Sequence, residues 1–333
     1  MAAIMVFFNH VVVAPHTRQP PAQDISFLSQ WGVWLGEQLH IGVPIFFVLS
    51  GFLITTRYFH RLELTGPWFR RYLQNRFARI YPIYLLLTLL TFAVMFLRPT
   101  QQWYEWPDVY PLIDKVAVLF LNLTLTRAYF ADLVVMGVPP AWTLTVEETF
   151  YLLAPFLLLG LKRNFRLLYL YPVLLLSIGV ALVLFCSRFL PYYGLMADIN
   201  FLLQSTFFGR CIEFLVGIGL AFFVARRTED SQRGVRATFL GLAGIVACLV
   251  GLAWVQHTIT NSVAWLVAYR SINNVLLPGT VAVLFWGLIK ERTRLRQLLE
   301  TTAFDLLGKS SYVFYLIHLG VIDTLFSEYI TEN

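Results

Sequence analysis

The chain has 333 residues, of which 58% are hydrophobic and 13% are charged, and its formal net charge is +6. Its mean hydropathy is +0.67. Soluble domains average about 25% charged residues, so a chain of this composition cannot cover a water-facing surface, and a soluble globular protein is excluded.

The basic residues stand in short loops between apolar runs, so the positive charge indicates membrane topology rather than nucleic-acid binding. The three cysteines, Cys186, Cys211 and Cys248, lie in separate apolar runs without a close-spaced pair. This spacing argues against disulfides and against a cysteine-based metal site. We therefore expect an all-α, polytopic transmembrane helical bundle that forms a single domain over residues 1–333.

Nine apolar runs follow one another along the chain. A spanning helix needs about 17–25 mostly apolar residues; the first run is shorter than this, and the last two are near the lower limit. The runs are Met1–Ala14, Leu39–Thr56, Ile80–Leu97, Trp142–Leu161, Leu167–Cys186, Ser205–Ala225, Ala237–Gln256, Val275–Ile289 and Ser310–Phe326. They predict about nine to ten membrane helices.

Loop charge predicts the orientation of these helices. Four connections are rich in Lys and Arg, at residues 57–79, 162–166, 226–236 and 290–296, and the positive-inside rule places them in the cytoplasm. All four fall on one side only if the short apolar run Val116–Thr126 does not span. We expect that run to be re-entrant or buried against other helices, with the N-terminus inside and the C-terminus outside.

Two adjacent carboxylates, Glu147 and Glu148, stand near the start of the fourth run. Thr145 and Glu148 have the spacing of a capping box, which predicts a helix that begins at Thr145, with Glu148 bonded back to the Thr145 N–H. Glu147 has no such structural explanation. A carboxylate near hydrocarbon is costly unless it is paired or faces a wet cavity, so Glu147 is the stronger functional candidate.

Two histidines lie on the predicted outer side. His10 lies in the first apolar run, and its imidazole is suited to take a proton from a hydroxyl group. The alternative is a histidine that hydrogen-bonds a neighbouring helix. His40 opens the second run and is expected to line the same cavity, although an ordinary interfacial histidine fits its position equally well.

Arg76 and Arg79 lie one helical turn apart just before a spanning run. Guanidinium groups bind phosphate through bidentate hydrogen bonds, so the pair indicates a phosphorylated cytosolic ligand; the alternative is a lipid-headgroup anchor. In the second run, Ser50 and Gly51 permit close helix approach and leave backbone groups open to a ligand. Packing alone explains them about as well.

From the residues alone, a histidine and a carboxylate in the membrane with an arginine pair nearby support proton abstraction and phosphate binding. No nucleotide-binding glycine loop, zinc-helix motif or nucleophile elbow is present in the sequence. These features do not distinguish an enzyme from a proton-coupled transporter.

Six motifs in order nevertheless resemble one family. They are His10 late in the first helix, Phe46-Phe-Val-Leu-Ser-Gly-Phe-Leu-Ile54, Arg76-Phe-Ala-Arg-Ile-Tyr-Pro82, Trp142-Thr-Leu-Thr-Val-Glu-Glu-Thr-Phe-Tyr151, Glu213-Phe-Leu-Val-Gly217 and Leu307-Gly-Lys-Ser-Ser-Tyr-Val-Phe-Tyr-Leu-Ile-His318. Together they resemble the acyltransferase-3 family, bacterial integral-membrane enzymes that O-acylate carbohydrates.

The resemblance implies an acyl-CoA donor in the cytoplasm, most simply acetyl-CoA, and a carbohydrate hydroxyl acceptor, as in polysaccharide modification. It implies His10 and Glu147 as catalytic residues, with Glu147 orienting the imidazole. Arg76 and Arg79, with Ser50 and Gly51, correspond to the donor-binding motifs. On the acceptor side we expect three further residues, Trp142, Glu148 and His40.

The resemblance also implies a multi-pass protein of the bacterial cytoplasmic membrane, without a bound cofactor, metal or nucleic-acid partner. Members usually carry an arginine before the catalytic histidine and one more span at the C-terminus, so this chain is expected to be truncated at both ends. The alternatives are a proton-coupled transporter or an inactive truncated membrane protein. The sequence does not indicate the oligomeric state.

Overall fold

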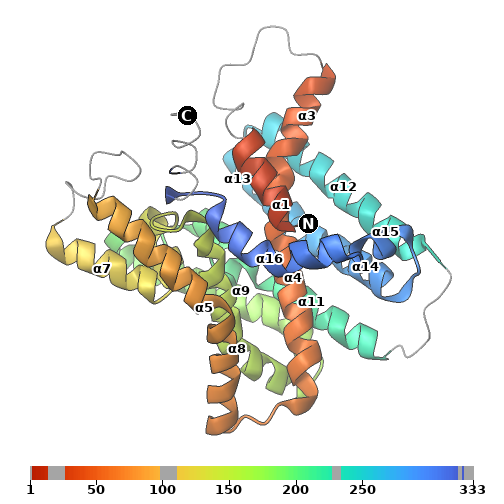
Figure 1. Cartoon of the computed structure of the whole chain (residues 1–333), viewed down its shortest axis with the longest axis horizontal. Coiled ribbons are helices and arrows are strands. Elements are labelled where there is room, and N and C mark those ends of the chain that lie inside the picture. The colour runs from red at the N-terminus through yellow and green to blue at the C-terminus, as the bar shows by residue number, and fades with distance from the viewer. Residues whose placement is uncertain (1, 14–26, 98–110, 227–233, 322–324, 326–333) are drawn as a thin grey trace. The chain divides into compact units, whose positions relative to one another are not determined.

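The computed structural model describes residues 2–13, 27–97, 111–226, 234–321 and 325, and within them it contains helices and no strand (Figure 1). The all-α prediction is confirmed. Two short elements, η1 and η8, are π-helical, and the other η elements are 3₁₀ turns. In chain order the elements are α1 (Ala2–Phe7), η1 (Phe8–Val13), α3 (Phe27–Glu37), η2 (Gln38–Ile41), α4 (Gly42–Tyr58), η3 (Phe59–Arg61), α5 (Gly66–Leu97), α7 (Leu112–Leu123), η4 (Arg127–Tyr129), η5 (Ala131–Leu133), η6 (Pro139–Ala141), α8 (Trp142–Arg163), α9 (Leu167–Phe189), η7 (Tyr192–Gly194), α10 (Ile199–Ser205), α11 (Phe207–Arg226), α12 (Arg236–Thr258), α13 (Ser262–Ser271), η8 (Ile272–Leu276), α14 (Leu277–Lys290), α15 (Arg294–Leu299) and α16 (Thr302–Ile317).

Within the described residues, 7 helical stretches are long and apolar enough to cross a membrane, as expected of a multi-pass membrane protein. They cover seven of the nine predicted runs, so the number of nine to ten is not confirmed. The other two runs lie at the chain ends, in α1 with η1 and in α16, which has 16 residues. The stretches are Gln30–Arg61, Gly66–Leu97, Pro139–Arg163, Leu167–Phe189, Ile199–Arg226, Arg236–Thr258 and Ser262–Lys290.

Helix α7 covers most of the run that was expected not to span. It has only 12 residues and is not among the stretches long enough to cross. At about 1.5 Å per residue such a helix is near 18 Å long, well short of a hydrocarbon core of about 30 Å. Its length therefore agrees with that prediction, while the orientation of the helices in the membrane stays a prediction.

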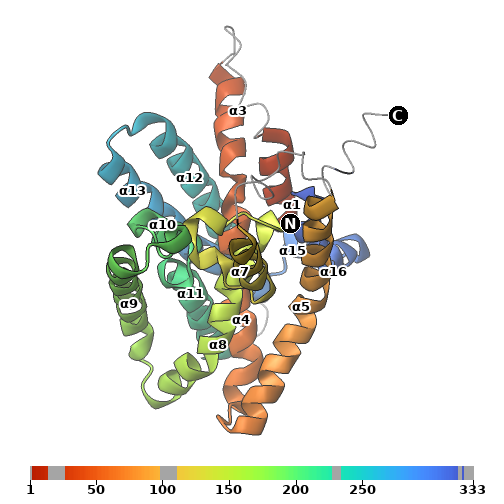
Figure 2. The same cartoon turned by 90° about the vertical axis from the view of Figure 1, so that its left-hand side faces the viewer.

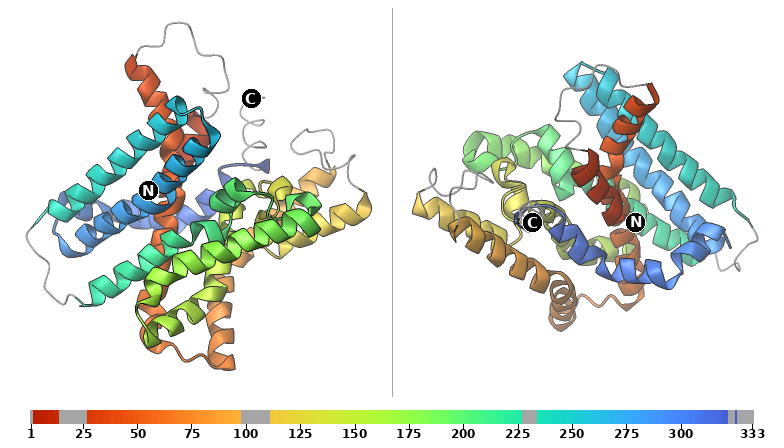
Figure 3. Two further views of the ribbon diagram at one scale, coloured as in Figure 1. Left: turned by 180° about the vertical axis from the view of Figure 1, so that it is seen from behind. Right: turned by 45° about the horizontal axis from the view of Figure 1, so that its top comes forward.

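The chain divides into two compact units. Unit 1 comprises residues 1–61 and 212–315, and unit 2 comprises residues 62–211 and 316–333. In unit 1, α12 and α14 pack side by side (Figure 3), around a core cluster that includes Ile245, Leu252 and Val281. In unit 2, α9 follows α8 and packs against it (Figure 2). Each unit therefore has its own packed helices.

A proline inside α8 explains one of the contacts between α5 and α8. Pro155 has no N–H, so the carbonyl of Tyr151, four residues earlier, lacks its usual helical donor. The hydroxyl of Tyr72 on α5 donates to that carbonyl at 3.0 Å. The freed backbone group in α8 is therefore satisfied by a side chain from α5, which fixes the two helices together at this level.

The segment that leads into α8 is organised by Arg127, whose side chain is fully buried. Its guanidinium donates to the carbonyls of Leu133 at 3.3 Å and Val134 at 2.9 Å, and also to those of Met136 and Val138. A buried irregular segment must satisfy its backbone polar groups. One arginine does this for four carbonyls and so holds the approach to α8.

The predicted start of α8 is wrong. The helix begins at Trp142, three residues earlier than expected, with Ala141 at the N-cap position and no side-chain cap. The 3₁₀ turn Pro139–Ala141 leads directly into it, because proline at the start of a helical segment fixes φ near the helical value. Thr145 is therefore an interior helical residue, and the capping box with Glu148 does not form.

Candidate functional site

Unit 2 carries a buried polar cluster between α5 and α8. On α5, Tyr72 and Arg76 lie four residues apart, so they share one face of the helix; both are buried, and Arg76 is 6% exposed. The Arg76 guanidinium carbon lies 5.8 Å from the centre of the Tyr151 ring. A desolvated cation over an aromatic face is stabilised by the ring quadrupole, so Tyr151 holds Arg76 toward α8.

The two adjacent carboxylates of α8 differ in their hydrogen bonds. Glu147 is 2% exposed, and its Oε1 accepts a short hydrogen bond from the Tyr151 hydroxyl. Glu148 is 7% exposed, yet neither of its carboxylate oxygens has a hydrogen-bond partner among the residues that the structure describes. The capping hydrogen bond expected for Glu148 is therefore absent. Of the two carboxylates, Glu147 is the one with a hydrogen-bond partner.

The arginine pair is divided between two environments. Arg76 is buried in the cluster, whereas Arg79, one turn further along α5, is exposed. Only Arg79 therefore presents an accessible guanidinium of the kind that binds phosphate. Arg76 lies within electrostatic range of Glu148, and its charge acts inside the cluster. The expectation that both arginines meet the same ligand stays a prediction.

The first turn of α8 is supported from the preceding segment. Trp142, at the start of the helix, is half-buried. The Tyr129 hydroxyl lies 2.6 Å from Thr149 Oγ1, and Thr149 donates to the Thr145 carbonyl at 2.7 Å. Burial raises the pKa of Tyr129, and the hydrogen bond with Thr149 offsets this only in part. Tyr129 is therefore a neutral hydrogen-bond donor to α8.

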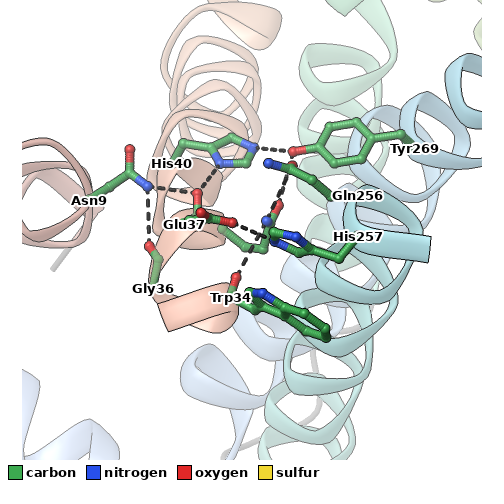
Figure 4. Close-up of polar contacts among 9 residues, drawn as sticks. Asn9, Trp34, Gly36, Glu37, His40, Gln256, His257 and Tyr269 are labelled. Carbon is green, nitrogen blue, oxygen red and sulfur yellow. Dashed lines mark hydrogen bonds and ion pairs between the residues drawn. The ribbon is translucent and has the colours of Figure 1, made fainter. Parts of the chain in front are cut away.

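In unit 1, His10 is half-buried on the π-helical turn η1. Its neighbour Asn9 donates through Nδ2 to two backbone carbonyls, at 3.1 Å to Gly36 and at 2.6 Å to Glu37. These carbonyls lie where α3 passes into the 3₁₀ turn η2, and a change of helical type leaves carbonyls open to side-chain donors. Asn9 therefore ties the turn that carries His10 to the end of α3 (Figure 4).

His40 belongs to the same set of contacts. Its Nδ1 lies 3.1 Å from the Glu37 carbonyl, the group that also accepts from Asn9, and its Nε2 lies 3.2 Å from the Tyr269 hydroxyl. Tyr269 donates in turn to Gln38 Oε1 at 3.0 Å. In Figure 4 the His40 side chain points from η2 toward the Tyr269 hydroxyl. The structure thus links the turn that carries His10 to His40 through the Glu37 carbonyl. A cavity that both histidines line stays a prediction.

An exposed pair continues this network. His257 Nε2 lies 2.7 Å from Glu37 Oε2, and the Trp34 ring stacks on the imidazole with ring centres 4.3 Å apart. His257 lies on α12. On the same helix, Gln256 Oε1 accepts a hydrogen bond from Gln38 Nε2 at 3.3 Å. These contacts fasten α3 and η2 to α12, so the residues around His40 are held from two sides.

Gly51 is explained by packing. On α4, Ser50 and Gly51 are both buried, and a Cβ built on Gly51 would overlap the backbone carbonyl of Phe214 on α11. A Cβ on Gly217 of α11 would likewise overlap the Val48 carbonyl of α4. The two glycines therefore allow the backbones of α4 and α11 to touch. A donor-binding role for Ser50 and Gly51 stays a prediction.

Chemically, unit 2 offers a buried carboxylate with open oxygens beside a guanidinium, and unit 1 offers an imidazole on an irregular turn. These groups are suited to proton transfer and to stabilising negative charge. Within the described residues, no three His, Cys, Asp or Glu side chains are grouped to hold a metal ion. The pairing of His10 with Glu147, which lie in different units, stays a prediction.

Comparisons with known proteins cover nearly the whole chain. The model of a family described as an acyltransferase domain matches residues 1–331. The chain is 24% identical over 318 residues to the O-acetyltransferase OatA of Staphylococcus aureus strain NCTC 8325, covering 87% of this chain and 47% of that protein. It is 23% identical over 308 residues to the putative O-acetyltransferase SACOL0978 of S. aureus strain COL, with the same coverage of 87% and 47%.

The chain thus spans about half the length of the curated relatives it matches. No solved structure matches it.

Proposed function

The chain belongs to the acyltransferase-3 family, and on this premise we propose that it is a membrane O-acetyltransferase that transfers an acetyl group from acetyl-CoA to a carbohydrate hydroxyl. The names of its relatives describe O-acetyltransferases, which supports the acetyl group and the O-linked product. The proposed setting is the bacterial cytoplasmic membrane, with the donor in the cytoplasm and a cell-surface or exported glycan as the acceptor.

The observation that carries this proposal is the buried carboxylate of Glu148, whose oxygens lack hydrogen-bond partners among the described residues. A carboxylate without hydrogen-bond partners inside a membrane helix is costly and is retained where chemistry needs it. Its neighbour Arg76 is also buried and is suited to stabilise negative charge that develops on a thioester oxygen. Exposed Arg79 is suited to the phosphates of the donor.

In the proposed reaction, the acetyl thioester reaches a buried site in the membrane, where His10 removes the proton from the acceptor hydroxyl and the hydroxyl oxygen attacks the carbonyl carbon of the thioester. The new C–O bond forms, the C–S bond breaks, and the CoA thiolate takes the proton back from the imidazolium. Atoms and charges balance without a further reactant. General base catalysis contributes about 10²–10⁴-fold, so loss of His10 reduces transfer to near the background.

The test is transfer of labelled acetyl groups from acetyl-CoA to surface carbohydrate in membranes that contain the full chain. Alkali-labile label should appear with wild type and with His60→Ala, a control at an exposed histidine. The label should be absent with His10→Ala and absent with Glu148→Gln, each tested separately and each present in the membrane at the same amount as wild type. Full transfer by His10→Ala would refute its role as base.

The same open carboxylate also suits a proton relay, so a proton-coupled transporter is the second candidate. That candidate predicts solute flux into vesicles that depends on Glu148, without any covalent acetyl label. Label without flux favours the enzyme, and flux without label favours the transporter. An inactive truncated membrane protein would show neither.

A further inference from the structure

A second set of buried polar side chains lies inside unit 1, on a stretch that the sequence motifs do not mark. Arg270 ends α13, and Asn273 and Asn274 lie on the π-helical turn η8, which joins α13 to α14 within one candidate membrane span, Ser262–Lys290. Their exposed fractions are 8%, 1% and 3%. A π-helical turn with polar residues inside a membrane helix is a recurrent mark of a functional site.

One polar atom in this set has no partner. Asn273 Nδ2 donates to Asn274 Oδ1 at 2.8 Å, whereas the buried Oδ1 of Asn273 has no hydrogen-bond partner within the described residues. Reversing both side-chain amides would only replace the open acceptor with an open donor. Either way, Asn273 keeps one unsatisfied polar atom in a buried position, and such atoms are rare in native proteins.

The position of Asn273 connects it with the contacts around His40. Tyr269 lies four residues before Asn273, hence on about the same side of the helix, and its hydroxyl contacts Gln38 and His40. The Arg270 guanidinium carbon lies 5.6 Å from the Tyr269 ring centre and 5.8 Å from that of Trp265. Polar groups thus continue from the turn of His10, through η2 and Tyr269, to η8.

The chemistry of this set restricts the ligand. A cation is disfavoured by the Arg270 charge. With the Asn273 oxygen as the open atom, a carboxylate or phosphate is disfavoured too, because its lone pairs would face those of that oxygen; a hydroxyl suits either amide orientation. A neutral hydroxyl fits both groups, because it donates to Oδ1 and accepts from a guanidinium. The amide N–H groups of CoA would also be able to donate to Oδ1. The polar groups that lead from η8 reach the turn of His10, the proposed base, and this favours the acceptor hydroxyl over CoA.

We propose that Asn273, together with Arg270, binds a hydroxyl group of the carbohydrate acceptor inside unit 1. This inference rests on the proposed O-acetyl transfer, and it adds an acceptor-binding position on η8. Losing one neutral hydrogen bond in a binding site of this kind weakens affinity by about three- to tenfold.

The kinetic test uses the full chain in lipid nanodiscs, with acetyl-CoA as donor and N-acetylglucosamine as acceptor. Asn273→Ala should raise the KM for the sugar about three- to tenfold, with the KM for acetyl-CoA and kcat little changed. Ser271→Ala, at an exposed position on the preceding turn, should leave all three unchanged. An unchanged KM for the sugar, or a rise in the KM for acetyl-CoA alone, would overturn the inference.

A binding measurement separates this inference from the proposed function. Amide hydrogen exchange of residues 269–277 should slow when glycerol, glucose or N-acetylglucosamine is added to wild type, and should not respond to CoA. Protection by a sugar without acetyl transfer would refute the proposed function and leave the hydroxyl site standing. If none of the three probes slows exchange, the proposed hydroxyl site is overturned. In the kinetic test, Asn273→Ser takes the place of Asn273→Ala if the alanine variant does not fold.

Discussion

The two neighbouring carboxylates of α8 should respond in opposite ways to the same substitution. In Glu148→Gln, a buried charge with two unpartnered oxygens becomes a neutral amide of the same shape. An unsatisfied buried polar group costs about 1–3 kcal/mol, and more when charged, while attraction to nearby Arg76 offsets part of this cost. We expect Glu148→Gln to stabilise the fold by about 1 kcal/mol and to abolish acetyl transfer.

Glu147→Gln is the matched control, because it makes the same chemical change one residue earlier. It converts the charge-assisted bond from the Tyr151 hydroxyl into a neutral one, which lowers stability by about 1 kcal/mol. The assay is thermal unfolding of the purified variants in one detergent, with acetyl transfer measured alongside. If Glu148→Gln destabilises the protein as much as Glu147→Gln does, then Glu148 has partners of its own and the reasoning fails.

Two further predictions concern helix contacts. Gly51→Ala forces a methyl group against the Phe214 backbone and should destabilise the protein by about 1–3 kcal/mol. The control Gly279→Ala, with no described atom within 4 Å of its Cβ position, should be neutral or stabilising. Equal unfolding temperatures of the two variants would contradict the packing explanation for Gly51. Glu291 accepts hydrogen bonds from Ala237 N at 2.8 Å and from Thr238 N and Oγ1 at 2.9 and 2.7 Å; burial raises its pKa, but these bonds outweigh burial and leave the pKa lowered. Because the folded-state pKa is the lower one, this stabilisation is present above the unfolded-state pKa and is lost as pH falls through the folded-state value. The difference in unfolding temperature between wild type and Glu291→Gln should therefore be large at neutral pH and vanish in acid; a difference independent of pH would show that hydrogen bonding to the charged form is not its cause.

The helical class and all seven stretches that are long and apolar enough to span, within the described residues, were predictable, because the thickness of a bilayer sets the length of an apolar run and a membrane helix satisfies its own backbone. The non-spanning character expected for residues 116–126 followed from loop charge, and the short helix α7 agrees with it. The start of α8 was not predictable from Thr145 and Glu148, since two prolines just upstream begin the helix earlier and remove the capping role.

The contact between α5 and α8 could not be predicted, since Tyr72 and the Tyr151 carbonyl are distant in the chain; Tyr151, by contrast, lies one helical turn from Glu147. Sequence alone ranked Glu147 above Glu148, because only Glu148 had a local capping partner in the pattern. In the fold Glu147 has a hydrogen-bond partner one turn further along α8, Tyr151, whereas the Glu148 oxygens have none within the described residues. Which of the two carboxylates acts in catalysis stays a prediction.

Arg127 and Asn273 show why residue type alone does not locate a membrane site. Both are buried polar residues, but Arg127 donates to four backbone carbonyls and stabilises a segment, whereas Asn273 keeps an unsatisfied oxygen. In hydrocarbon, where water cannot satisfy the remaining groups, that difference separates a structural residue from a candidate binding residue. Applied to the two carboxylates of α8, this criterion predicts that acetyl transfer depends on Glu148 more than on Glu147, so loss of transfer in Glu147→Gln with full transfer in Glu148→Gln would refute it.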